Sequence, residues 1–63
     1  MNTAVKLVRL KDADSGTTVL INPFQIKVEY DNHDYRTIEF AEDAVVDVLD
    51  TIEEIATIVN RSF

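Results

Sequence analysis

The chain has 63 residues, 46% of them hydrophobic, with no cysteine and a net charge of −6. This length allows one domain, which buries only about 60% of the surface of its unfolded chain, and the lack of cysteine excludes disulfides and Cys-based metal sites. The negative charge disfavours direct binding to nucleic acid or to anionic membranes, because their phosphates would repel it. Since so small a core usually needs help from a partner copy, we expect a homodimer.

The N-terminal part predicts two strands, over residues 4–10 and 17–21. Both segments are rich in β-branched and aliphatic residues. The polar segment 11–16 between them contains the only glycine, Gly16, which can supply a positive φ in a turn. Pro23 ends the second strand, because proline donates no hydrogen bond to a β-ladder.

The next two predicted strands, residues 25–30 and 35–40, alternate between apolar and polar side chains. In the first, Ile26, Val28 and Tyr30 share one face. In the second, Ile38 and Phe40 are expected to point inward, with Thr37 and Glu39 outward. This pattern is typical of an antiparallel hairpin with one solvated face.

From Asp43 the apolar period changes from two to 3.6 residues, which predicts a helix over residues 43–60. Asp43 is a suitable N-cap, and Arg61 lies near the C-terminal end, where a positive charge favours the helix dipole. The expected fold is α+β: an antiparallel sheet of three to four strands, followed by one amphipathic helix that packs on one face. We expect residues 1–63 to form a single domain.

Acidic residues are concentrated in residues 29–54, which hold ten of the twelve acids, a single base, Arg36, and a net charge of −9. On the predicted helix four of them form a straight stripe opposite the apolar face, with successive carboxylates about 5–6 Å apart along the axis, a spacing broadly similar to that of phosphates on a DNA strand. Two readings stay open: a solvated helix face, or a functional surface that imitates nucleic acid. The stripe residues are Asp43, Asp47, Asp50 and Glu54, and Glu42 and Glu53 widen it.

No catalytic motif is present. His33 lies between Asp31 and Asp34 in a polar turn, but this ligand set is short for a metal and lacks a calcium-loop pattern. We therefore expect no enzyme activity, no metal and no cofactor. Phe24 follows Pro23 at the tip of a connection, where an aromatic side chain either fills the core or projects as an anchor into a partner's pocket.

No apolar run reaches the ~20 residues that cross a bilayer, and the N-terminus does not resemble a signal peptide. We expect a cytoplasmic protein with no membrane contact.

Segments 19–26, 28–29 and 38–43 resemble the small FlbD-like domains of bacteria and phages. Such a domain runs from a short opening strand, through a break with the pattern Asn-Pro-x-x-Ile, to an acidic capped helix. The resemblance implies a ββββα fold and a flagellar or other regulatory role, without catalytic residues. The chain departs from it in two respects, because its second hairpin turn lacks glycine and its helix lacks lysines. Leu7, Arg9 and Leu10 match the opening strand.

By charge and size the chain also resembles phage-encoded proteins that mimic DNA and take over host functions. We therefore expect an acidic, non-enzymatic inhibitor in the bacterial host cell. It would bind the basic nucleic-acid-binding surface of a nucleoid-associated protein, a nuclease or a DNA-repair enzyme such as uracil-DNA glycosylase. The alternative is an FlbD-like structural or regulatory module whose acidity only aids solubility. The expected partner-binding residues are Glu42, Asp43, Asp47, Asp50, Glu53, Glu54 and Phe24.

Overall fold

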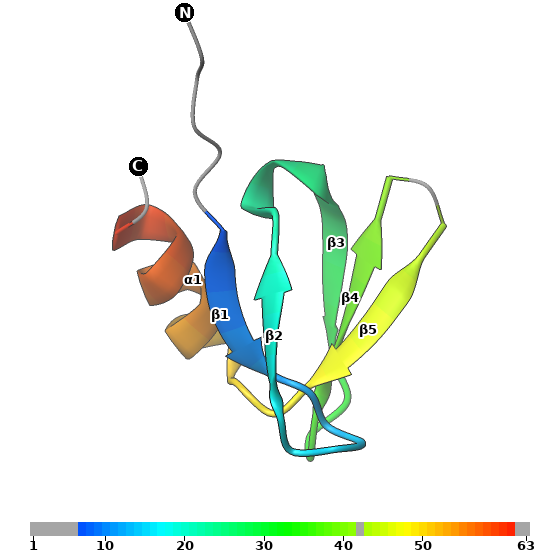
Figure 1. Ribbon diagram of the computed structural model, residues 1–63. Helices are drawn as coiled ribbons and strands as arrows, with labels where there is room; N and C mark the ends of the chain where they lie inside the picture. The colour runs from blue at the N-terminus through cyan, green and yellow to red at the C-terminus, as the bar shows by residue number, and fades with distance from the viewer. Residues whose placement is uncertain (1–6, 42, 62–63) are drawn as a thin grey trace, which may run out of the picture.

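The computed structural model describes residues 7–41 and 43–61 (Figure 1). Its five strands form two antiparallel sheets, β1-β2 and β3-β4-β5, and one helix follows them. The α+β class predicted from the sequence is confirmed. Residues 4–6 of the first predicted strand lie outside the described residues. The elements are β1 (Val8–Lys11), β2 (Thr18–Ile21), the 3-10 helix η1 (Pro23–Gln25), β3 (Ile26–Asp31), β4 (Arg36–Phe40), β5 (Val45–Val48) and α1 (Ile52–Arg61).

The two sheets are joined where the end of β1 meets the end of β5. Asp12 and Val48 form an antiparallel bridge. Ala13 N–H donates to the Asp47 carbonyl, and Leu49 N–H donates to the Lys11 carbonyl, each at 2.8 Å. Hydrogen bonding therefore continues in the order β2-β1-β5-β4-β3, which leaves β2 and β3 as the two edge strands.

Residues 45–48 form a strand, so the predicted helix over residues 43–60 is wrong in its first part. Val45, Val46 and Val48 are β-branched, and such residues pack well on a pleated sheet. The three-residue spacing of Val45 and Val48 suits the helical period that predicted the helix, but the same spacing also occurs by chance within a short strand. Asp43 is not an N-cap: its φ of 64° places it in the left-handed region, in the turn before β5.

A bulge in β3 changes which of its side chains face inward. The register shifts between Ile26 and Val28, so that Glu29 stands opposite Ile38. Ile38 is fully buried, and directly paired residues share a face of the sheet. The predicted inward positions of Ile38 and Phe40 are confirmed, whereas the common face predicted for Ile26, Val28 and Tyr30 is wrong.

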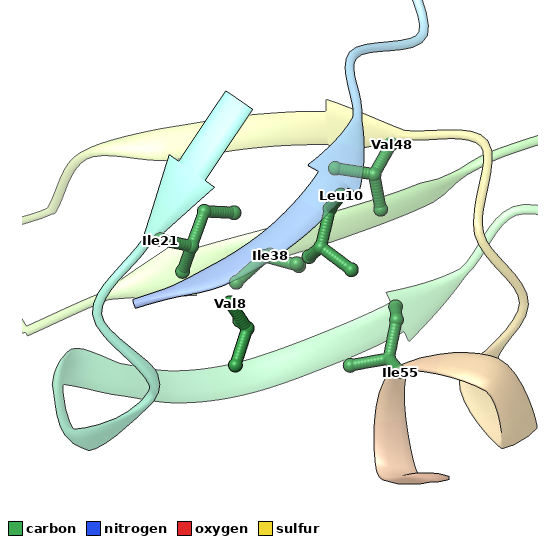
Figure 2. Close-up of a cluster of buried hydrophobic side chains, with 6 residues drawn as sticks. All are labelled: Val8, Leu10, Ile21, Ile38, Val48 and Ile55. Atoms are coloured by element: carbon green, nitrogen blue, oxygen red, sulfur yellow. The ribbon is translucent and has the colours of Figure 1, made fainter. Parts of the chain in front are cut away.

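The core is formed by side chains from four strands and the helix, which point toward one another in Figure 2. In β1 only the alternate residues Val8 and Leu10 are buried. Ile55 is the buried residue of α1 and docks the helix on this cluster. Gly16 adopts the predicted positive φ, at 72°. No helix of the described residues is long and apolar enough to cross a membrane. The core residues are Val8, Leu10, Ile21, Ile38, Val48 and Ile55.

Candidate interaction surface

Acidic residues gather at the end of the molecule where the first, third and fifth connections lie, the lower end in Figure 1. These connections are residues 12–17, 32–35 and 49–51. Counted with the adjoining ends of β3, β5 and α1, the first and third connections carry two acids each and the fifth carries four, which makes eight of the twelve acids in the chain. The bases at this end are Lys11 and Arg36. We call this surface the acidic end. Its acids are Asp12, Asp14, Asp31, Asp34, Asp47, Asp50, Glu53 and Glu54.

The first connection is organised by Asp12. Its carboxylate accepts a hydrogen bond from Ser15 N–H at 2.9 Å and one from the Ser15 hydroxyl at 2.8 Å. These bonds hold the pKa of Asp12 below its usual value, and the bond from the backbone N–H has the larger effect. They do so because they stabilise the charged form. Asp12 therefore closes the turn as an ionised side chain.

Asp47 and Asp50 fasten the strands that meet at this end. The Thr37 hydroxyl donates to Asp47 Oδ1 at 2.7 Å, and Asn32 Nδ2 donates to Thr37 Oγ1 at 2.8 Å. Asp50 Oδ1 accepts a hydrogen bond from Lys11 N–H at 2.7 Å. Both carboxylates consequently have a role in holding the fold.

Arg36 is the mostly buried base of the acidic end, with a side chain only 11% exposed. Its Nε lies 3.4 Å from Asp31 Oδ1, and its Nη1 donates to the Leu49 carbonyl at 3.3 Å. The positive charge of Arg36 thus lies beside the Asp31 carboxylate and offsets part of the negative charge of the acidic end.

Glu54 closes the N-terminus of α1 in a capping box with Thr51. Thr51 N–H donates to Glu54 Oε1 at 3.0 Å, and Glu54 N–H donates to Thr51 Oγ1 at 3.1 Å. The pKa of Glu54 is lowered most by the hydrogen bond from the Thr51 N–H, less by the Thr51 hydroxyl and least by the charge of Arg36. This cap explains why the helix begins at Ile52.

Three acids of this end are exposed and have no side-chain hydrogen bond or ion pair with another residue that the structure describes. They are Asp14, Asp34 and Glu53. Their carboxylates are therefore available to a partner without any loss of contacts within the fold.

The helical stripe predicted from the sequence does not exist. Asp47 lies in β5, Asp50 precedes the helix, and only Glu53 and Glu54 are helical. The structure brings these four together at the acidic end. Asp43 lies in the β4–β5 turn at the opposite end (Figure 1), and Glu42 falls outside the described residues.

Sequence reasoning missed the contribution of Asp12, Asp14, Asp31 and Asp34 to the same surface. A signal was present, because successive connections of up-and-down strands alternate between two ends. The first, third and fifth connections then share one end, but the fifth could be counted only once β5 had been recognised.

Phe24 does not fill the core, since its side chain is 70% exposed. Asn22 caps η1 by accepting a hydrogen bond from Phe24 N–H at 3.0 Å. This exposure excludes the alternative in which Phe24 fills the core. The alternative in which Phe24 projects as an anchor into a partner's pocket stays a prediction. His33 has a positive φ in the third connection, and no group of three potential metal ligands is found within residues 7–41 and 43–61.

No family model, curated protein or solved structure matches this chain. Both resemblances stated above therefore stay predictions.

Proposed function

We propose that the chain is a non-enzymatic binding protein whose acidic end occupies the basic nucleic-acid-binding surface of a partner protein. One observation supports this most: the fold collects eight of twelve acids at one end, where the two bases are Lys11 and the mostly buried Arg36. A concentrated negative field speeds association with a basic surface and disfavours acidic partners.

The hydrogen bonds of the acidic end favour this use. Hydrogen bonds lower the pKa values of Asp12 and Glu54, which favours their charged forms. Asp47 and Asp50 are held by Thr37 and by the backbone of Lys11. Carboxylates that are already fixed lose less conformational entropy on binding.

The acids form a patch over three connections and not a straight line along a helix. A patch of this kind fits a broad basic surface better than a narrow groove that follows a single nucleic-acid strand. The proposed partner is therefore still a nucleoid-associated protein, a nuclease or a DNA-repair enzyme, as expected from the sequence. The acids that imitate nucleic acid form a patch, however, and not a straight helical stripe.

A competing account assigns the acids only to turns, capping and solubility, as in an FlbD-like module. It draws on the fact that Asp12, Asp31, Asp47, Asp50 and Glu54 all have partners within the fold. The three exposed acids without such partners separate the two accounts, because they have no role in the fold that a substitution would disturb.

The experiment measures binding to three purified bacterial proteins: a nucleoid-associated protein, a nuclease and uracil-DNA glycosylase. We expect Asp34→Lys and Glu53→Lys each to weaken binding to the recognised protein several-fold, and added salt to weaken the wild type. Asp43→Lys is the matched control, since it makes the same charge change in an exposed turn at the opposite end. Equal affinities for all variants, or no binding to any of the three proteins, would contradict the proposal.

A further inference from the structure

The strand β2 is a sheet edge that lacks the usual protection against pairing with another chain. Among the described residues it pairs with β1 alone. Its sequence, Thr-Val-Leu-Ile, has no charge and no proline. The other edge, β3, has a bulge and the charged side chains of Lys27 and Glu29. Charges and bulges are common means of preventing edge-to-edge association, so only the β2 edge is open to a further strand.

An apolar groove of about 390 Å³ lies beside this edge, between β2 and the turn that joins β4 to β5. Leu20 lines it and is 59% exposed. None of its lining residues is charged, although 29% of the chain is. The lining consists of Val19, Leu20, Ile21, Asn22, Gln25, Phe40, Ala41, Ala44 and Val46.

The charge distribution identifies a second copy of this chain as the occupant. Each copy carries a net charge of −6, so two copies can approach closely only through a surface without acids. The groove is such a surface. Its lining residues include some from η1 and the β4–β5 turn, and these two segments lie at the end opposite the acidic end (Figure 1). A basic partner, in contrast, would find no carboxylate in the lining to pair with. Three described acids, Glu39, Asp43 and Asp47, each adjoin a lining residue in sequence but do not themselves line the groove.

We propose that two copies associate through antiparallel pairing of β2 with β2 about a two-fold axis. The free backbone N–H and C=O groups of the two edges pair with one another, and Leu20 of each copy covers the groove of the other. Such an interface is isologous, so the same patch serves both copies. The dimer presents two acidic ends on surfaces away from the interface. The interface does not depend on the function proposed above.

Sedimentation equilibrium of the full chain, from low micromolar to millimolar concentration, tests the dimer. We expect Leu20→Glu to raise the dimer dissociation constant by about tenfold or more, because it places two like charges at the symmetric strand pair. Leu49→Glu is the matched control: it adds the same charge at an exposed leucine of the fifth connection and should leave the dimer unchanged. Salt should strengthen the dimer by screening the repulsion between copies, which is the opposite of its expected effect on a basic partner.

A wild-type chain that stays monomeric at millimolar concentration would overturn the proposal, as would equal dimerisation of both variants. Far-UV circular dichroism of each variant establishes that it is folded. Amide hydrogen exchange of the wild type provides a readout without substitution: protection that rises with protein concentration should be confined to β2 and the groove. Concentration-dependent protection of β3 or α1, with β2 unchanged, would also contradict it.

Discussion

Glu29 stands opposite Ile38 across the β3–β4 ladder, so a carboxylate shares the face of the sheet that covers the core. Burial raises the pKa of Glu29 above its ordinary value of 4.5, because desolvation disfavours the charged form. The folded chain then binds this proton more tightly than the unfolded chain does. Glu29 therefore reduces stability at neutral pH, and this penalty disappears as the pH falls below the ordinary carboxyl range.

We predict that Glu29→Gln increases the free energy of unfolding at about pH 7, where Glu29 is charged, and has little effect at about pH 3, where it is neutral in both states. Urea unfolding at the two pH values measures this difference. Glu39→Gln is the control on the neighbouring strand: its carboxylate lies 3.6 Å from Lys27 Nζ, so its removal should bring no such gain. A loss of stability in Glu29→Gln at neutral pH would contradict an inward-facing Glu29.

Asp43 distinguishes the observed β-turn from a helix N-cap. At a φ of 64° a glycine avoids the strain of a side chain, so Asp43→Gly should leave stability unchanged or raise it by up to about 1 kcal/mol. If Asp43 capped a helix, the same substitution would cost a few tenths of a kcal/mol. The sign of the change in thermal unfolding decides between the two.

The capping box makes Thr51 important for α1. Thr51→Ala removes the hydroxyl that accepts from Glu54 N–H and should cost about 1 kcal/mol. Thr57→Ala, the control, lies within the same helix and donates only to the Glu53 carbonyl, so it should be neutral or slightly stabilising. Urea unfolding followed by far-UV circular dichroism measures both, and equal losses would show that the cap is unimportant.

The helix is held on the sheets mainly by Ile55, which is 1% exposed. We expect Ile55→Ala to cost about 2–5 kcal/mol and Ile55→Val about 1 kcal/mol. For a domain of this size the larger loss approaches the total stability, so the alanine variant should be substantially unfolded. A fully folded Ile55→Ala chain would mean that α1 is not part of the cooperative core.

The sequence was sufficient for the parts of the fold that are determined locally. Gly16 marked the first turn, Pro23 ended β2, and the alternation of β4 identified Ile38 as a core residue. The bulge near Lys27 could not be foreseen, because it depends on how β3 aligns with β4. The identity of residues 45–48 was ambiguous, since Val45 and Val48 suit either a helix or a strand and only pairing with β4 selects the strand.

The candidate surface could be predicted only in part for the same reason. Asp47, Asp50, Glu53 and Glu54 were identified as a group, and the structure does bring them together. Their arrangement, and the exclusion of Asp43 from it, depend on where the helix begins. Thr51 decides this by capping α1, and its pattern with Glu54 is a recognisable start signal that competed with the longer apolar periodicity.

Displacement of DNA tests the central claim most directly. A fluorescent DNA duplex is bound to the nucleoid-associated protein, nuclease or glycosylase that the chain recognises, and its anisotropy is followed as the chain is added. We predict that the wild type and Asp43→Lys release the DNA at similar concentrations, whereas Asp34→Lys and Glu53→Lys require several-fold more. Formation of a ternary complex without DNA release, or equal potency of all four proteins, would contradict the claim that the acidic end occupies the nucleic-acid-binding surface.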